Sequence, residues 1–495
     1  MASRTARSLI SLSWQSTAYG LGTLGRQAVV YLALPLFTNH MPQEEFGVVS
    51  VTAAFLAFVN TLSNAGLPAA TFRLYNDTQD VKTRRLTLGS SQTLIGGYAL
   101  LTALVMLLAV DPLARFLLGT SSYAHIIRVV AVLLLVESLI NYGNILLRIQ
   151  VRPLATSIQS VLQIVVQLGL AVLLVRRYDL GALGYWLGYL AGALVGLALM
   201  LWLVRDALVF RVSREHMKGM IVYGLPLIPA ALALWALRLV DRGVVVSLAG
   251  LDEVAVYEVG YKIGMLVALV VGPFRAAWPQ FAFSTMHSPH ASRIYRDTLT
   301  YVAAGCTFIA LGVIAFRVDL VQIMAPSTYI RAVDVVPWVA LSQVAWGMYP
   351  VLAVGLNIAK RTPYITAATV FAAAVNIILN VLLIPVIGIQ GAAIATLLGY
   401  TALAGGVYIM AQRFYAFPID WSRLGKLALA SGLTVLLVSQ LGGLDLSLWG
   451  GRAVRSVGLL LFPILLLVTG FVTQKQCRLL WQTGTGLLRK RFQGA

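Results

Sequence analysis

The sequence predicts an all-α protein that crosses a membrane about fourteen times, with two six-helix lobes and two further C-terminal helices. Of its 495 residues, 59% are hydrophobic and only 11% are charged, whereas about a quarter of an ordinary soluble protein is charged. Apolar stretches recur from end to end, each long enough for the ~20 residues that a bilayer-spanning helix needs. A pattern in the first half of the chain also returns in the second half. These three observations predict a polytopic bundle with an internal repeat.

The apolar stretches predict the individual spans in order. We expect helices at residues 11–38, 46–67, 88–110, 124–147, 154–175, 181–204, 219–248, 254–283, 298–316, 335–358, 363–385, 390–411, 425–441 and 455–473. Lysine and arginine gather on alternate loops, and the positive-inside rule then places both termini in the cytoplasm. The same asymmetry explains the net charge of +19 without a nucleic-acid partner, which would need a soluble basic surface. The loops are too short for a soluble core, so the function must lie within the bundle.

The internal repeat predicts the domain organisation. Pro153 precedes the pair Gly181-Ala182 by the same number of residues that separates Pro363 from Gly391-Ala392. A unit of six helices enters the membrane from the same side each time, so the copies are parallel repeats, which are typical of transporters. The alternative is that repetition only eases packing. The expected units are an N-lobe at 1–205, a C-lobe at 206–412 and a C-terminal pair with its tail at 413–495.

Charged side chains inside two expected spans point to a functional cavity. Arg238, Asp241 and Arg242 fall within one span, and Glu258 and Lys262 fall within the next. Each charge at a helix centre costs about 2.5–3.5 kcal/mol on insertion scales, so such residues usually face a bundle interior. The spacing lets Arg238 pair with Asp241 and Glu258 pair with Lys262. Charge pairing is one interpretation of these acidic residues and Lys262, and ion coupling is the other.

Two further charges stand alone in their spans. Arg26 lies among small residues in the first span, and Glu137 lies near the middle of the fourth. A carboxylate buried in a span is a functional-site candidate, so Glu137 could exchange protons and couple transport to an ion gradient. Arg26, Arg238 and Arg242 outnumber Asp241 and Glu137. The surplus guanidinium groups suit an anion, and arginine binds phosphate through a planar fork of donors.

Polar amides and prolines complete the candidate residues. Amides recur on one helical face at Gln159, Gln163 and Gln167, and again at Asn376 and Asn380. Such stripes can bind sugar hydroxyls in a cavity, or they can join helices by hydrogen bonds. The seventh span begins with two prolines, Pro226 and Pro229, which remove backbone donors and favour a kink. The kink is either a hinge or a static bend.

Several motifs resemble one transporter family. They are LPLFTNHMPQEEFGVVSV after the first span, YGLPLIP followed by LRLVDRGVVVSLAGLDEVAVYEVGYKIG, and GIQGAAIATLLGY. With fourteen spans they resemble the polysaccharide repeat-unit (Wzx-like) flippases, in the superfamily that also holds lipid II flippases and multidrug exporters. The resemblance implies a V-shaped, alternating-access cavity and an undecaprenyl-diphosphate-linked oligosaccharide as substrate. Arg26 and Arg242 match places where the family carries cationic residues.

The expected function is therefore a non-enzymatic flippase of a bacterial inner membrane that serves surface polysaccharide synthesis. There is no phosphate-cradling G-x-x-x-x-G-K-[ST] motif, so we expect no cofactor and an H⁺ or Na⁺ gradient as the energy source. Expected partners are the glycan lipid, membrane lipid, a polysaccharide polymerase and a chain-length regulator. The alternatives are a cation-coupled multidrug exporter, a lipid II flippase and a membrane glycan-modifying enzyme.

Overall fold

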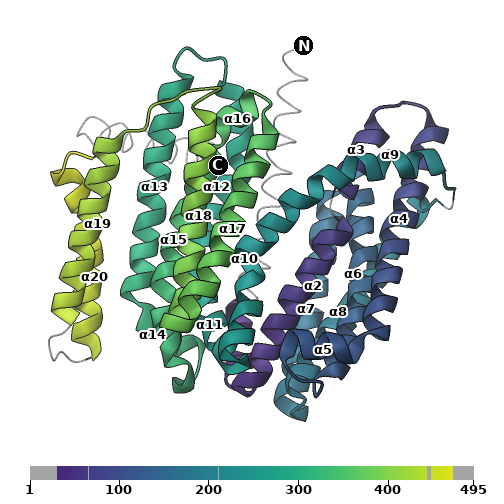
Figure 1. The fold of residues 1–495 in the computed structure, drawn as a ribbon, viewed down its shortest axis with the longest axis horizontal. Coiled ribbons are helices and arrows are strands. Elements are labelled where there is room, and N and C mark those ends of the chain that lie inside the picture. The colour runs from purple at the N-terminus through teal and green to yellow at the C-terminus, as the bar shows by residue number, and fades with distance from the viewer. Residues whose placement is uncertain (1–30, 65, 210, 443–447, 472–495) are drawn as a thin grey trace, which may run out of the picture.

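The computed structural model describes residues 31–64, 66–209, 211–442 and 448–471, and they form an all-α membrane protein as predicted (Figure 1). Twelve helices or helix pairs among them are long and apolar enough to cross a bilayer. The first expected span lies mostly outside the described residues. The thirteenth is a helix, α19, although it is not one of the twelve.

The N-terminal group of helices stands on the right of Figure 1. Asp80 caps the longest of them, because its carboxylate accepts from the backbone N–H groups of Lys82 and Thr83, two of the donors that a helix start leaves open. The members are α2 (Gln43–Asn64), α3 (Leu67–Asn76), α4 (Val81–Leu108), α5 (Val110–Leu118), α6 (Ala124–Ile149), α7 (Pro153–Tyr178) and α8 (Gly181–Val204).

A second group stands on the left, and α10 runs obliquely between the two groups (Figure 1). The seventh expected span is α9 (Arg214–Gly224), the short 3₁₀ turn η2 (Leu225–Leu227) and α10 (Ile228–Ala249). The remaining members are α11 (Leu251–Gly264), η3 (Met265–Val267), α12 (Ala268–Thr285), α13 (Ala291–Ala315), α14 (Arg317–Met324), η4 (Ser327–Asp334), α15 (Val336–Leu352), α16 (Val354–Ile358), α17 (Thr362–Ile387) and α18 (Ile389–Ala411).

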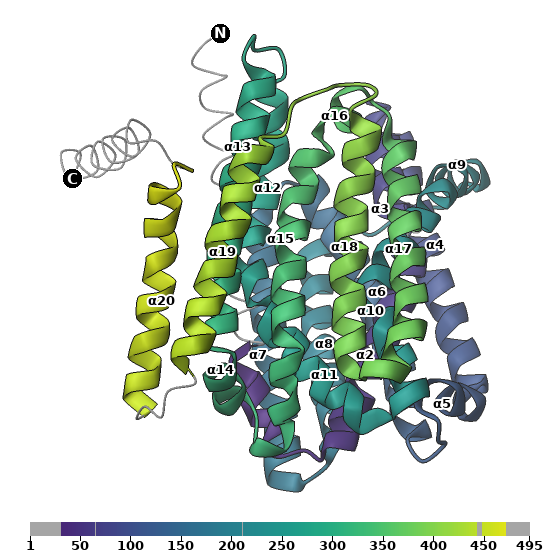
Figure 2. The same ribbon diagram turned by 60° about the vertical axis from the view of Figure 1, so that its left-hand side comes forward.

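Two C-terminal helices, α19 (Trp421–Gly442) and α20 (Leu448–Val468), lie side by side at the edge of this second group (Figure 2). Both contact α13. An ionic contact also holds α20 to α14, because Asp319 accepts hydrogen bonds from Arg452, at 2.8 Å, and from Arg455. The pair is therefore attached to the C-lobe by both apolar packing and charge.

The repeat in the sequence is also a repeat in the backbone. Helices α7 and α8 form one antiparallel hairpin, and α17 and α18 form its counterpart. Val151 and Lys360, shortly before the two hairpins, both have a left-handed φ, near 55°. Such a conformation is uncommon for a residue with a side chain. Its recurrence at equivalent positions shows that the two hairpins start in the same way.

The connection between the lobes is docked onto the N-terminal group. The Ser213 backbone N–H donates to the Ser90 hydroxyl at 3.0 Å, and a Cβ at Gly89 would strike the Arg211 carbonyl oxygen. Helix α9 packs on α3 and α4. Gly66, at φ 77°, lies so close to Gly224 that a side chain would not fit. The connection therefore stays against the N-terminal group as far as Gly224.

Candidate functional site

Arg242 is the centre of a buried charge network on α10 and α11. Its side chain is 2% exposed, and its Nη1 lies 2.7 Å from an Asp241 carboxylate oxygen while its Nη2 lies 2.8 Å from Glu258. Lys262 lies 3.6 Å from the other oxygen of Glu258. Two carboxylates and two cations are thus combined in one cluster. Charge pairing and ion coupling were the two roles predicted for Asp241, Glu258 and Lys262, and these contacts support charge pairing.

The spacing allowed Asp241 to pair with Arg238, but its partner in the structure is Arg242. Asp241 is bonded to Arg242 and also accepts from the Tyr257 hydroxyl and, at 3.5 Å, from Thr396. These partners come from the packed faces of α11 and α18, and they hold the carboxylate on the buried side of α10. The Arg238 side chain is exposed instead. Helical spacing allowed either partner, and packing against the neighbouring helices decided between them.

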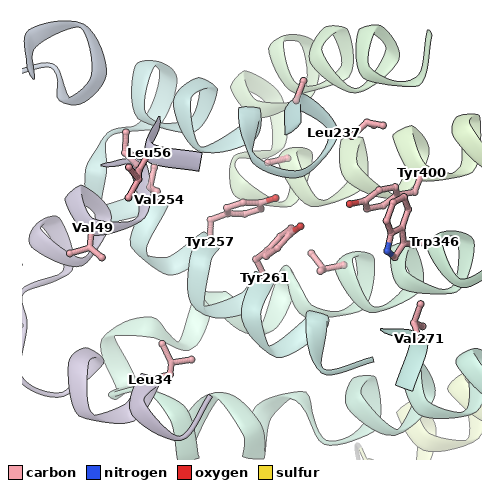
Figure 3. Packing of buried hydrophobic residues seen from close by; sticks show 14 of the residues in the cluster. Leu34, Val49, Leu56, Leu237, Val254, Tyr257, Tyr261, Val271, Trp346 and Tyr400 are labelled. Atoms are coloured by element: carbon pink, nitrogen blue, oxygen red, sulfur yellow. The ribbon is translucent and has the colours of Figure 1, made fainter. Parts of the chain in front are cut away.

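Aromatic rings surround this part of the C-lobe. Tyr257 and Tyr261 lie on one side of the view in Figure 3, and Tyr400 lies beside Trp346 on the other. The Arg242 guanidinium lies 4.0 Å from the centre of the Tyr261 ring, a favourable cation–π distance. Arg242 is therefore fully occupied by internal contacts.

Arg238 and Arg275 meet at a single aromatic side chain, Trp346 of α15. Their guanidinium carbons lie 5.0 and 3.6 Å from its ring centre, and Arg275 donates to the Trp346 carbonyl oxygen at 3.0 Å. Within the described residues neither guanidinium forms an ion pair. Two uncompensated cations therefore stand together on the C-lobe, and we call them the arginine pair.

Sequence reasoning did not single out Arg275. It lies in α12 between Pro273 and Pro279, inside an expected span. An arginine between two prolines in an apolar stretch was a usable signal, because the prolines weaken the helix where the charge must be accommodated. Only the fold shows that it meets Arg238, which lies on another helix. Arg26 lies outside the described residues.

A second polar site lies in the N-lobe. A cavity of about 140 Å³ separates α6 from α7. Asn60 of α2 donates to the Glu137 carboxylate at 3.0 Å. The site thus unites the Glu137 carboxylate with the glutamine stripe; the polar lining residues are Glu137, Asn141, Asn144, Gln159, Ser160, Gln163 and Gln167.

The glutamine stripe also joins helices, whereas the asparagine stripe is bonded within its own helix. Gln159 donates to the Gly196 carbonyl oxygen at 3.3 Å and Gln167 to that of Tyr189 at 3.4 Å, both on α8. On α17, Asn380 donates to the Asn376 carbonyl oxygen at 2.9 Å, and both asparagines are buried. The interhelical interpretation therefore applies to Gln159 and Gln167, while Gln163 is only half-buried at the cavity.

An apolar groove of about 440 Å³ lies between α2 and α5 on one side and α10 on the other. Helix α10 contributes Trp235, Leu239 and Gly243, and α2 contributes Phe55 and Phe58. The groove therefore involves both lobes, and Leu239 is the neighbour of Arg238 in the chain. Of the predicted hinge residues, Pro226 lies in η2 and Pro229 in the first turn of α10.

Comparison with known proteins identifies the family. The model of the family described as polysaccharide biosynthesis protein matches residues 14–287, more than half of the chain. The chain belongs to this family. A similar protein is the uncharacterized membrane protein YabM of Bacillus subtilis (strain 168), 24% identical over 424 residues that cover 76% of each chain.

Solved structures show the same fold for this member of the polysaccharide biosynthesis family. It is similar to an inward closed conformation of the lipid II flippase MurJ, with a TM-score of 0.68 and 14% identity over 90% of this chain and 97% of the other. It is also similar to an inward-facing multidrug resistance transporter of the MATE family in the MOP superfamily, with a TM-score of 0.58 and 18% identity over 78% and 94%. The chain thus has the fold of a transporter, as the sequence predicted.

Proposed function

We propose that this protein is a flippase that moves an undecaprenyl-diphosphate-linked oligosaccharide across the bacterial inner membrane by alternating access. An H⁺ or Na⁺ gradient supplies the energy, and both termini lie in the cytoplasm. The product serves surface polysaccharide synthesis, where a polymerase and a chain-length regulator act next. Membership of the polysaccharide biosynthesis family supports this substrate class.

The arginine pair carries the proposal. Arg238 and Arg275 place two guanidinium groups against Trp346 with no ion-pair partner in the described part of the chain. A diphosphate offers several anionic oxygens to such planar donor groups. Arg242 is not part of this binding site, because Asp241 and Glu258 already neutralise it. A cationic drug would be repelled by the pair, which disfavours the multidrug exporter.

The apolar groove beside α10 suits the lipid part of the substrate. Its lining is aromatic and aliphatic, and burial of apolar surface is the interaction available to a polyprenyl chain. Leu239 lines the groove directly next to Arg238 along α10. Diphosphate on the arginine pair would therefore leave the attached tail near the groove.

The first test measures binding of undecaprenyl diphosphate to the purified protein in nanodiscs. Loss of one hydrogen-bonded charge costs about 1.5–3 kcal/mol, so Arg238→Ala and Arg275→Ala should each weaken binding by roughly 10- to 100-fold. Arg238→Lys should weaken binding less than Arg238→Ala, because lysine keeps the positive charge. Arg115→Ala is the matched control, since Arg115 is exposed on α5, and it should bind normally.

Binding of the uncharged alcohol undecaprenol completes the test. None of the arginine variants should change it, because the alcohol has no phosphate. Wild-type affinity for the diphosphate in both alanine variants would rule out the arginine pair as its site. In cells, the same variants should insert normally and lose surface glycan.

A further inference from the structure

We infer that the N-lobe cavity binds a sugar unit of the substrate through its hydroxyl groups, while the arginine pair binds the diphosphate. This inference rests on the proposed function, because it divides the proposed substrate between the two lobes. It concerns the cavity between α6 and α7, which contains Glu137, the asparagines of α6 and the glutamines of α7.

The orientation of Gln163 is determined by its neighbour. Gln159 donates one amide hydrogen bond to the Gln163 side-chain oxygen at 2.9 Å and another to the Gly196 carbonyl oxygen. A primary amide has one oxygen and two N–H donors. With its oxygen occupied, Gln163 presents its N–H donors to the cavity, and its half-buried side chain is accessible there.

The facing helix supplies an acceptor. The Asn144 side-chain oxygen is buried and has no hydrogen-bond partner among the residues that the structure describes, which is costly for a polar atom unless a ligand or water satisfies it. Asn141, one turn before it, is half-buried and also lines the cavity. A sugar hydroxyl both donates and accepts, so it complements a site with Gln163 donors on one side and the Asn144 oxygen on the other.

Charge and size distinguish this cavity from the arginine pair. Its polar lining consists of amides, one hydroxyl and the Glu137 carboxylate, and no cation is among the described residues that line it. Among the residues that the structure describes, a phosphate would find no charge complement there. The volume of about 140 Å³ corresponds to a few water molecules at ~30 Å³ each. Such a space takes part of one sugar unit, with its hydroxyl groups, rather than a whole oligosaccharide.

The experiment compares two ligands across variants from the two sites. The probes are undecaprenyl diphosphate and undecaprenyl diphosphate carrying one hexose, bound to the protein in nanodiscs. Gln163→Leu and, independently, Asn141→Leu should weaken binding of the hexose-bearing lipid by about fivefold, the loss of a single neutral hydrogen bond. Both should leave binding of the bare diphosphate unchanged.

Control variants separate this inference from the proposed function. Arg238→Ala should weaken binding of both ligands equally. Gln322→Leu, on the exposed face of α14, should change the binding of neither ligand. The sugar site would be overturned if both cavity variants bound the hexose-bearing lipid normally, or if they lost equal affinity for both ligands. Neither result would contradict the diphosphate site. Failure of the wild-type protein to bind either lipid would overturn both. Thermal unfolding of each variant shows whether it is folded.

Discussion

Arg242 and Arg238 lie one turn apart on α10, and their environments differ. Arg242 is buried between Asp241 and Glu258, whereas Arg238 is exposed beside Trp346. Desolvating two charges offsets much of their attraction, so a buried ion pair adds little net stability, yet removing one partner leaves the other charge uncompensated. Arg242 is thus needed for the fold, and Arg238 is available for a ligand.

This contrast predicts opposite phenotypes for two arginine variants. Arg242→Ala should destabilise the protein by about 3–5 kcal/mol, the usual result of breaking a buried pair, and Arg238→Ala should not. Thermal unfolding in detergent measures the difference. The double variant Asp241→Asn with Arg242→Gln removes both charges and should recover part of the loss. An Arg242→Ala protein as stable as the wild type would contradict a structural role for the network.

The ionic contact between α14 and α20 attaches a C-terminal element to the C-lobe. Burial opposes ionisation of Asp319, but its hydrogen bonds and charge interactions with Arg452 and Arg455 outweigh that effect and hold the pKa of this carboxyl below its ordinary value of 3.8. A carboxyl with a lowered pKa stabilises the folded arrangement above its ordinary pKa and loses that contribution as the pH falls through the lowered value.

The attachment of α20 should therefore weaken in acid. At pH values above 4 the Asp319 contact is complete, and below the lowered pKa it is lost. Hydrogen exchange of α20 peptides, corrected for the intrinsic pH dependence of exchange, should show faster opening at the acidic end. Asp319→Asn should give the faster opening already at neutral pH and remove most of the pH dependence. Equal exchange in the two proteins at neutral pH would contradict this attachment.

At the scale of the whole molecule, the packing of the connecting segment bears on where the two groups of helices divide. Residues 211–224 lie against α4 and the start of α3: Arg211 and Ser213 contact α4, and Gly224 contacts Gly66, which directly precedes α3. We therefore propose that this segment moves with the N-lobe, and that the boundary lies at η2, where Pro226 interrupts the helix, rather than at residue 205. In that arrangement Pro226 is at the hinge and Pro229 begins the C-lobe helix.

Paired cross-links test this boundary in a protein whose native cysteines are replaced by alanine. Leu74→Cys with Gly219→Cys joins α3 to α9, where the Leu74 side chain lies 3.8 Å from the Cβ position of Gly219. Phe58→Cys with Trp235→Cys joins α2 to α10, where the two rings are 4.7 Å apart. With a short thiol cross-linker, transport should survive the first link and stop with the second.

Each pair is its own control, because transport after cross-linking is compared with transport by the same variant before it; Phe58 and Trp235 line the apolar groove, so the second pair is expected to start from a reduced rate. Arrest by the α3–α9 link would show that α9 moves relative to the N-lobe and would refute the boundary at η2. Undiminished transport with the α2–α10 link would refute alternating access through separation of these two helices.

Composition and spacing alone were sufficient to predict the all-α membrane fold, nearly all the helices, and the repeat that begins at Pro153 and Pro363. Burial in a bilayer demands long apolar helices, and that demand is local in the sequence. The partners of the charged side chains could not be predicted in this way. The spacing allowed Asp241 to pair with either arginine, and Arg275 is distant from Arg238 in the chain. Only the packing of α10 against α11 and α18 placed Arg242 between the carboxylates, and only the packing of α12 against α15 placed Arg275 on the Trp346 ring that Arg238 also contacts. Contacts between helices depend on which faces meet.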